Sequence, residues 1–189
     1  MKIGISMKLG QSGSATNQVT FEDCWVGDTA LLGELNRGFA IAMGELAGGR
    51  IGIASLALGV GSAAIDYARS YIVEREQFGR KLSDFQGLQW QLADRYTELE
   101  AARLLVLQAA WVKEQGRDFA KLASMAKLFA SEKANEACYT AVQLLGGNGY
   151  SAEYPVERMA RDARITTIYE GTSEIQRVII SRQLLSELG

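Results

Sequence analysis

The chain has 189 residues, a net charge of −2 and no histidine. The lack of histidine excludes Ser-His-Asp and Cys-His catalysis, which need imidazole as the base, and two distant cysteines indicate reduced thiols rather than a zinc site or a disulfide framework. The mildly negative charge disfavours nucleic acid as a partner, because binding to a phosphate backbone depends on a positive surface. Catalysis therefore has to rest on carboxylates, hydroxyls, backbone groups or a cofactor.

Residues 1–35 differ in pattern from the rest of the chain. Val19 and Phe21 alternate with polar neighbours, a period of two that is typical of a strand. One or two strands do not form a stable sheet alone. We therefore expect residues 1–35 to be the end of a larger unit or an edge that pairs elsewhere, and residues 36–189 to form a helical domain.

Apolar residues at helical spacing predict three long helices and a shorter one. Their expected bounds are Asn36 to about Gly79, Asp84 to Gln115, Asp118 to Leu145 and Ser173 to Leu188. Short turns join them, so the predicted fold is mainly α, an antiparallel four-helix bundle with a short N-terminal β segment. The most apolar stretch, Ile51–Ile65, is shorter than the roughly 20 residues of a membrane span. We interpret it as a buried helix.

Two helix starts carry capping signals. Asp118 is a suitable N-cap for the third helix. Ser173 and Gln176 have the spacing of a capping box, which predicts that the last helix begins at Ser173. The charged stretch of residues 153–164 is not predicted to be a helix.

Three motifs leave structural and functional interpretations open. The sequence Gly59–Ala64 looks like a dinucleotide fingerprint, but a helical pattern runs through it, so we interpret it as small residues at a helix crossing. The turn Gly146–Gly149 either only ends a helix or lets a ligand approach its backbone. The segment Arg75–Lys81 is either a solvated helix end or a guanidinium and an aromatic face offered to a phosphate-bearing ligand.

Glu170 is the strongest candidate for a catalytic residue. It lies just before the last helix, and Gly171 allows a sharp turn there. The helix N-terminus favours a charged carboxylate, whereas enclosure by apolar groups favours the neutral acid. A general base needs that balance, although a carboxylate at this place can also be purely structural.

Taken together, these residues resemble the flavin-dependent acyl-CoA dehydrogenases over essentially the whole chain. The matching motifs occur in the family's order and at its spacing. They are Phe21-Glu22-Asp23-Cys24, Gly38-Phe39, Gly49-Arg50-Ile51, Arg75–Gly79, Gln86, Gln91–Asp94, Gln143–Tyr150, Arg161–Arg164 and Ile168–Gln176.

The resemblance implies FAD-dependent α,β-dehydrogenation of an acyl-CoA thioester to the 2-enoyl-CoA. Glu170 matches the base that removes the α proton, while the β carbon passes a hydride to FAD. Some relatives carry the base immediately before the residue that matches Arg50, and glycine occupies that position here, Gly49. The implied partners are an acyl-CoA, an electron-transfer flavoprotein and further copies of the chain as a homodimer or homotetramer.

The resemblance also carries over binding roles, residue by residue. Arg75, Gln77 and Phe78 match contacts to the FAD of a neighbouring subunit. Gln86 and the turn of Gln143, Leu144, Leu145, Gly146 and Gly147 match its adenosine side. Thr172, Ser173 and Glu174 match positions lining the flavin of their own subunit. Arg50 matches a residue that assists CoA binding, and Tyr169 and Gly171 match positions that border the thioester.

Two departures from the family accompany this match. Ala47 stands where many relatives carry an acid that helps to hold CoA. Family members also carry a helical domain and a complete β domain before this region. The resemblance therefore implies that residues 1–35 are the incomplete tail of a β domain and that the chain is a C-terminal fragment that is inactive alone. Acyl-CoA oxidase and a non-catalytic helical oligomerisation module are the alternatives. The expected location is the bacterial cytoplasm or, in a eukaryote, the mitochondrial matrix, without a membrane span or a metal.

Overall fold

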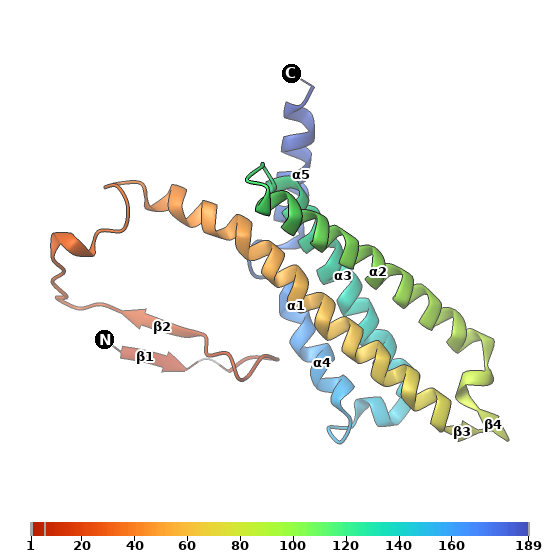
Figure 1. The fold of residues 1–189 in the computed structure, drawn as a ribbon. Coiled ribbons are helices and arrows are strands. Elements are labelled where there is room, and N and C mark those ends of the chain that lie inside the picture. Colours follow the sequence, from red (N-terminus) through yellow and green to blue (C-terminus); the bar gives the residue numbers. More distant parts are fainter. Residues whose placement is uncertain (1, 6, 189) are drawn as a thin grey trace.

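The computed structural model describes residues 2–5 and 7–188, and helices dominate this part of the chain (Figure 1). The helices are α1 (Gly38–Glu74), α2 (Gln86–Glu114), α3 (Ala120–Leu145), α4 (Pro155–Ala163) and α5 (Ser173–Ser186). The strands form two small antiparallel hairpins, β1 (Lys2–Ile5) with β2 (Asn17–Thr20), and β3 (Glu76–Gln77) with β4 (Arg80–Lys81).

The helices α1, α2 and α3 run alternately up and down, and the shorter α4 returns along α1 and α3 (Figure 1). The predicted antiparallel four-helix bundle is confirmed, but its fourth helix is α4, whereas the prediction gave that place to the last helix. α5 packs on α3 and projects beyond the bundle.

Small residues bring α1 and α3 close together. Ala54, Ala57 and Ala64 of α1 are completely buried, as are Ala130 and Ala134 of α3. A Cβ placed on Gly61 would lie 2.8 Å from the Cα of Ala134. The glycine pattern at residues 59–64 therefore belongs to a helix crossing, as predicted, because only a residue without a side chain fits at this contact.

The observed helix ends refine the predicted ones. Asp118 accepts a hydrogen bond from the backbone N–H of Ala120 at 3.0 Å, but the N-cap of α3 is Phe119, so the predicted cap is one residue too early. The predicted cap of α5 is wrong by one residue, because Thr172 is the N-cap and its hydroxyl accepts from the N–H of Ile175 at 3.4 Å. Ser173 is instead the first helical residue, and Gln176 is buried beneath the preceding turn.

α4 was not predicted as a helix. Its apolar residues do recur at helical spacing, and Pro155 at its first turn is a typical helix-start signal. Arg161 donates to Glu157 of the same helix at 2.8 Å and to the carbonyl of Leu9 at 3.0 Å. Through this second contact α4 anchors the N-terminal segment to the bundle.

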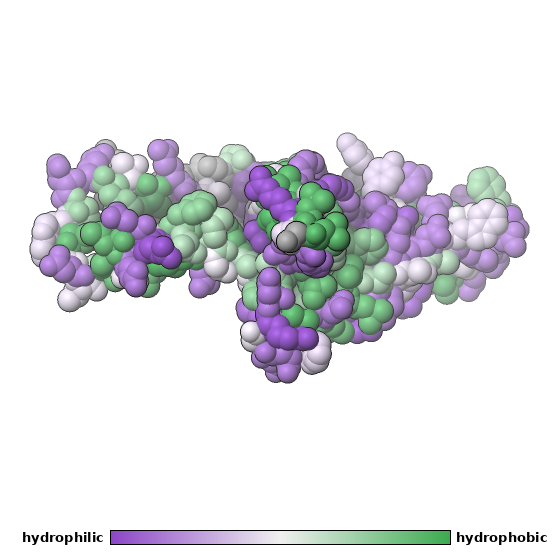
Figure 2. Space-filling model, turned by 90° about the horizontal axis from the view of Figure 1, so that it is seen from above, coloured by the Kyte–Doolittle hydropathy of each residue, from purple (hydrophilic) through white to green (hydrophobic). Residues whose placement is uncertain are grey.

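The strand predicted over residues 18–23 is confirmed in its first half as β2, which ends at Thr20 and pairs with β1 in the register Ile3 to Val19. The β1–β2 hairpin lies to one side of the bundle (Figure 1). The segment that follows it exposes large apolar side chains, and Figure 2 shows them gathered over this part of the chain and around the C-terminal helix. Members of this set are Phe21, Trp25, Leu32, Leu185 and Leu188.

α1 is long and apolar enough to cross a membrane by length and composition alone. Its inner face nevertheless packs against α2 and α3, and it carries a buried arginine, Arg50. The core helix of a globular bundle passes the same test, and the packing supports the interpretation of Ile51–Ile65 as part of a buried helix.

Candidate active site

The turn between Ile168 and α5 has an unusual backbone conformation. Glu170 has φ of 55° and Gly171 has φ of 90°. A non-glycine residue at positive φ is uncommon and persists where its surroundings hold it. Gln176 donates through Nε2 to the carbonyls of Glu170 and Gly171 at 3.1 and 2.9 Å, and Lys127 donates through Nζ to the carbonyl of Gly171 at 2.8 Å.

This turn directs the carboxyl group of Glu170 onto the backbone of Gly49. A Cβ built on Gly49 would lie only 2.6 Å from Oε2 and 3.1 Å from the carboxyl carbon. The absence of a side chain at position 49 is therefore what admits this carboxyl group. Oε2 is buried and has no hydrogen-bond partner, so one oxygen of this carboxyl group is an unsatisfied acceptor.

Cationic groups surround the Glu170 carboxylate. Arg50 follows Gly49 and is 8% exposed, and its Nε has no hydrogen-bond partner. Burial lowers the pKa of Arg50, and the charge of Glu170 partly offsets that effect. Burial also lowers the pKa of Lys127, to about 8. The positive charge of Arg50 adds to this effect, and the negative charge of Glu170 opposes it.

The N-terminus of α5 presents further unsatisfied polar groups. The hydroxyl of Ser173 and Oε1 of Gln176 are buried without a partner. Hydrogen bonds from its own backbone N–H and from the side chain of Thr172 lower the pKa of the exposed Glu174. Unpaired buried polar atoms are costly in a finished interior, so their concentration beside the Glu170 turn fits a site that a ligand completes.

Tyr169 points to a different side of the turn from Glu170. It borders a cavity of about 430 Å³ between the N-terminal segment and residues 161–169, whose lining combines apolar side chains such as Ile165 and Ile168 with three cationic ones. Its hydroxyl accepts a hydrogen bond from Nε2 of Gln11 at 3.4 Å. The structure thus assembles Arg50, Gly171 and Glu170 in one place and sets Tyr169 at its edge.

A second group of predicted residues lies at the other end of α1. Arg75 caps that end, and Gln77 and Phe78 belong to the β3–β4 hairpin, where the ring of Phe78 is 90% exposed. Gln86 is exposed at the first turn of α2. The β3–β4 hairpin and the start of α2 lie at the end of the bundle that is far from α5 (Figure 1).

The glycine turn after α3 belongs to the same end of the molecule. Nδ2 of Asn148 donates to the hydroxyl of Tyr71 at 2.8 Å, which ties the turn to the C-terminal part of α1. Gln143, Gly146 and Gly147 are exposed, and a Cβ on either glycine would meet only open space. The remaining two predicted contacts, Leu144 and Leu145, bury their side chains in the core and leave only their backbone available.

The two groups of residues are far apart. Arg50 and Arg75 are separated by 25 positions of one helix, which corresponds to about 37 Å at a rise of 1.5 Å per residue. Two separate surfaces of one chain therefore carry the predicted contacts, one around Glu170 and one around the β3–β4 hairpin.

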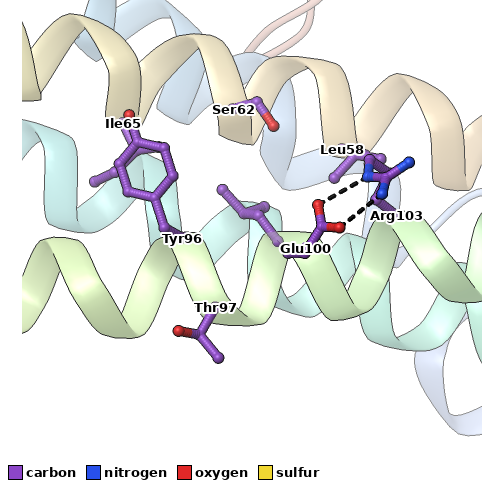
Figure 3. Close-up of a pocket in the computed structure, with 8 residues that line it drawn as sticks. Leu58, Ser62, Ile65, Tyr96, Thr97, Glu100 and Arg103 are labelled. Atoms are coloured by element: carbon purple, nitrogen blue, oxygen red, sulfur yellow. Dashed lines mark hydrogen bonds and ion pairs between the residues drawn. The ribbon is translucent and has the colours of Figure 1, made fainter.

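A groove of about 610 Å³ between α1 and α2 contains none of the predicted residues. Figure 3 shows that its one ion pair is internal, since Arg103 donates to Glu100 of the same helix at 2.6 and 2.8 Å. The described residues also hold no group of three or more potential metal ligands. The Glu170 turn is therefore the candidate active site.

Two residues of this site were missed by sequence reasoning. Lys127 and Gln176 reach the turn from α3 and from inside α5, and both are completely buried. Gln176 has a sequence signal, its spacing from Ser173, but the observed bonds run to the turn rather than to the cap. Lys127 has no sequence signal, because the carbonyl to which it donates belongs to Gly171, 44 residues away.

These features define a helical-bundle domain that holds a carboxylate, over a glycine, on a strained turn beside two buried cations. The family model described as acyl-CoA dehydrogenase, C-terminal domain, matches residues 36–185, and the chain belongs to that family.

Named relatives and a solved structure agree with the assignment. The chain is 52% identical to the human mitochondrial short-chain specific acyl-CoA dehydrogenase over 94% of its own length and 43% of that protein. It is 48% identical to the caffeyl-CoA reductase-Etf complex subunit CarC of Acetobacterium woodii over 97% of its own length and 50% of that protein.

The structure of butyryl-CoA dehydrogenase from Megasphaera elsdenii superposes with a TM-score of 0.95 at 46% identity, covering 96% of this chain and 48% of that one. The chain thus spans about half the length of the curated relatives it matches.

Proposed function

We propose that the complete protein containing this chain catalyses the α,β-dehydrogenation of an acyl-CoA thioester, with Glu170 as the base that removes the α proton. The carrying observation is the buried, unpartnered Oε2 of Glu170 held over Gly49. A relative's alternative base would stand at position 49, where this chain has no side chain. Glu170 is therefore the carboxylate of this site that fits the reaction.

The surroundings of Glu170 suit proton abstraction from carbon. Its Oε2 is shielded from the water that would otherwise solvate the carboxylate, and Arg50 and Lys127 place positive charge nearby. Its strained backbone fixes the direction of the side chain, which is what a proton transfer with a defined geometry needs.

FAD, when bound, supplies the acceptor for the hydride that leaves the β carbon. Residues of this chain that would hold it fit the role in three ways. Phe78 offers an exposed aromatic face, Gly146 and Gly147 leave room above their backbone, and Ser173 has a buried hydroxyl in need of a partner. We assign Thr172, Ser173 and Glu174 to the flavin of their own subunit.

The separation of about 37 Å along α1 supports a cofactor shared between subunits. We assign Arg75, Gln77 and Phe78 to the FAD of a neighbouring chain, with Gln86 and the backbone of residues 143–147 on its adenosine side. The exposed apolar side chains of the N-terminal segment and of α5 support assembly into a homodimer or homotetramer.

The substrate side of the site is assigned to three residues. Arg50 would assist CoA binding, and Tyr169 and Gly171 would border the thioester. The cavity beside Tyr169 supports an elongated ligand passing close to the turn. We assign the protein to the bacterial cytoplasm or the mitochondrial matrix. We assign residues 1–35 to a β domain.

Electron-transfer flavoprotein is the proposed electron acceptor, supported by the relative named as a subunit of a caffeyl-CoA reductase-Etf complex. That name, and that of the acryloyl-CoA reductase (NADH) of Anaerotignum propionicum at 47% identity, support a second candidate, reduction of a 2-enoyl-CoA. The same residues then serve the reverse direction, with Glu170 as the acid that protonates the α carbon.

The test of the base uses the complete, FAD-loaded protein. We expect Glu170→Gln to retain FAD and to lose reduction of the flavin by a short acyl-CoA, because the amide cannot take the α proton. Normal bleaching of the flavin by the variant would exclude Glu170 as the base. Oxygen and electron-transfer flavoprotein, supplied separately as acceptors, distinguish an oxidase from a dehydrogenase.

The test of the shared cofactor uses Arg75→Ala. We expect weaker FAD retention, and a greater loss on dilution, because dilution separates the subunits that hold the cofactor between them. Retention that does not depend on protein concentration would contradict the shared site. A purified complete protein that stays colourless with added FAD would support the non-catalytic alternative.

A further inference from the structure

We propose that Lys127 is a positioning residue for catalysis: by binding the carbonyl of Gly171 it holds the turn that aims the Glu170 carboxyl group at the substrate. This inference rests on the proposed role of Glu170 as the base. None of the motifs that mark the family includes Lys127.

The burial of Lys127 needs an explanation. Its side chain lies on α3 and is 0% exposed, and among the described residues no carboxylate lies within ion-pair distance of its ammonium group. A buried lysine without an ion pair is costly and is rarely retained for packing alone. Its one described hydrogen bond runs to the carbonyl oxygen of Gly171 at 2.8 Å.

That bond holds the turn that carries Glu170. Glu170 and Gly171 both have positive φ, so the turn is strained and has to be held by its neighbours. The Gly171 carbonyl receives two donors, Nζ of Lys127 and Nε2 of Gln176. The bond from the ammonium group is the charge-assisted one, which makes it the stronger restraint.

The charges facing Lys127 come from several elements. Arg50 of α1 repels it, and it is attracted by Glu132 of its own helix, by Glu170 of the turn and by Glu174 of α5. Lys127 therefore also contributes positive charge to the environment of the Glu170 carboxylate. Its lowered pKa, about 8, agrees with an ammonium group held in a mostly dry site.

The experiment compares Lys127→Met with Lys121→Met in the complete, FAD-loaded protein. Methionine keeps an unbranched side chain and removes the charge and the donors. Lys121 lies on the same helix, is partly exposed and pairs with Glu187, away from the turn. Glu170→Gln serves as the reference for a missing base.

Two quantities are measured. Amide hydrogen–deuterium exchange reports on the turn itself, and we expect exchange in peptides covering residues 168–173 to rise at least about tenfold in Lys127→Met. Steady-state kinetics with a short acyl-CoA should show kcat lowered about tenfold to a hundredfold with KM within about threefold, because a misaimed base slows chemistry more than binding. Lys121→Met should match the wild type in both.

The outcomes separate this inference from the proposed function. Unchanged exchange and unchanged kcat in Lys127→Met overturn the positioning role, and so does exchange raised evenly along α3, which marks a structural role. Normal flavin reduction in Glu170→Gln overturns the proposed base instead. If Lys127→Met does not fold, Lys127→Arg, which keeps the charge and moves the donor, is judged by the same two measurements.

Discussion

Gly49 offers a direct probe of the site, because a single methyl group added there displaces the proposed base. The Cβ of Gly49→Ala would lie 2.6 Å from Oε2, 3.3 Å from Oε1 and 3.1 Å from the carboxyl carbon of Glu170. Ordinary van der Waals contact begins at about 3.4 Å. The carboxyl group therefore has to retreat by about 0.8 Å.

The magnitude follows from that displacement. A misplacement of about 1 Å costs roughly a hundredfold in rate, which corresponds to about 2.7 kcal/mol of activation free energy. The same substitution lies inside α1, where alanine is favoured over glycine by about 0.5–1 kcal/mol. We therefore expect Gly49→Ala to lower the rate of flavin reduction about a hundredfold while leaving Tm unchanged or higher.

The assay is rapid-mixing reduction of the complete, FAD-loaded protein by a short acyl-CoA, with Tm measured on the same samples. Gly59→Ala is the matched control, because Gly59 lies on the same helix and a Cβ added to it meets nothing within 4 Å. It should reduce at the wild-type rate. Wild-type reduction by Gly49→Ala would refute the placement of the Glu170 carboxyl group over Gly49.

Three further predictions concern the bundle and its buried groups. Gly61→Val should lower stability by about 1–3 kcal/mol in chemical denaturation, because the side chain collides with α3; Gly59→Val, in open space, should not, and equal effects would contradict the close helix crossing. Alkylation of the native protein should modify the exposed Cys24 quickly and Cys138 slowly, since burial raises the pKa of Cys138 to about 12; equal rates would contradict its burial. Burial lowers the pKa of Lys127 from 10.5 to about 8, so between pH 8 and pH 10.5 the unfolded chain binds more protons than the folded chain. The difference in Tm between the wild type and Lys127→Met should therefore rise with pH across that window, and a difference that falls with pH would contradict this sign.

The long helices were predictable because their burial is periodic in the sequence. Ala54, Ala57 and Ala64 recur on the face of α1 that meets α3, and this spacing is visible without coordinates. α4 escaped because it is only nine residues long and four of these residues are charged, two arginines, one glutamate and one aspartate. Its apolar residues recur at helical spacing, but a stretch this short contains only two turns of the pattern.

The candidate site was predictable only in part. Glu170 stood out through its position before a helix and its glycine neighbour. The need for glycine at position 49 was not visible, because it comes from a contact with a carboxyl group more than a hundred residues away. Lys127 reads as an ordinary helical lysine, and its role depends on a carbonyl that only the tertiary fold brings to it. Local patterns do not encode such contacts.

The most direct measurement of the central claim is a crystal structure of the complete, FAD-loaded protein with an acyl-CoA analogue bound. We predict a carboxyl oxygen of Glu170 within about 3–3.5 Å of the α carbon of the ligand, on the face opposite the flavin. A Glu170 side chain turned into bulk water in that complex would contradict the account.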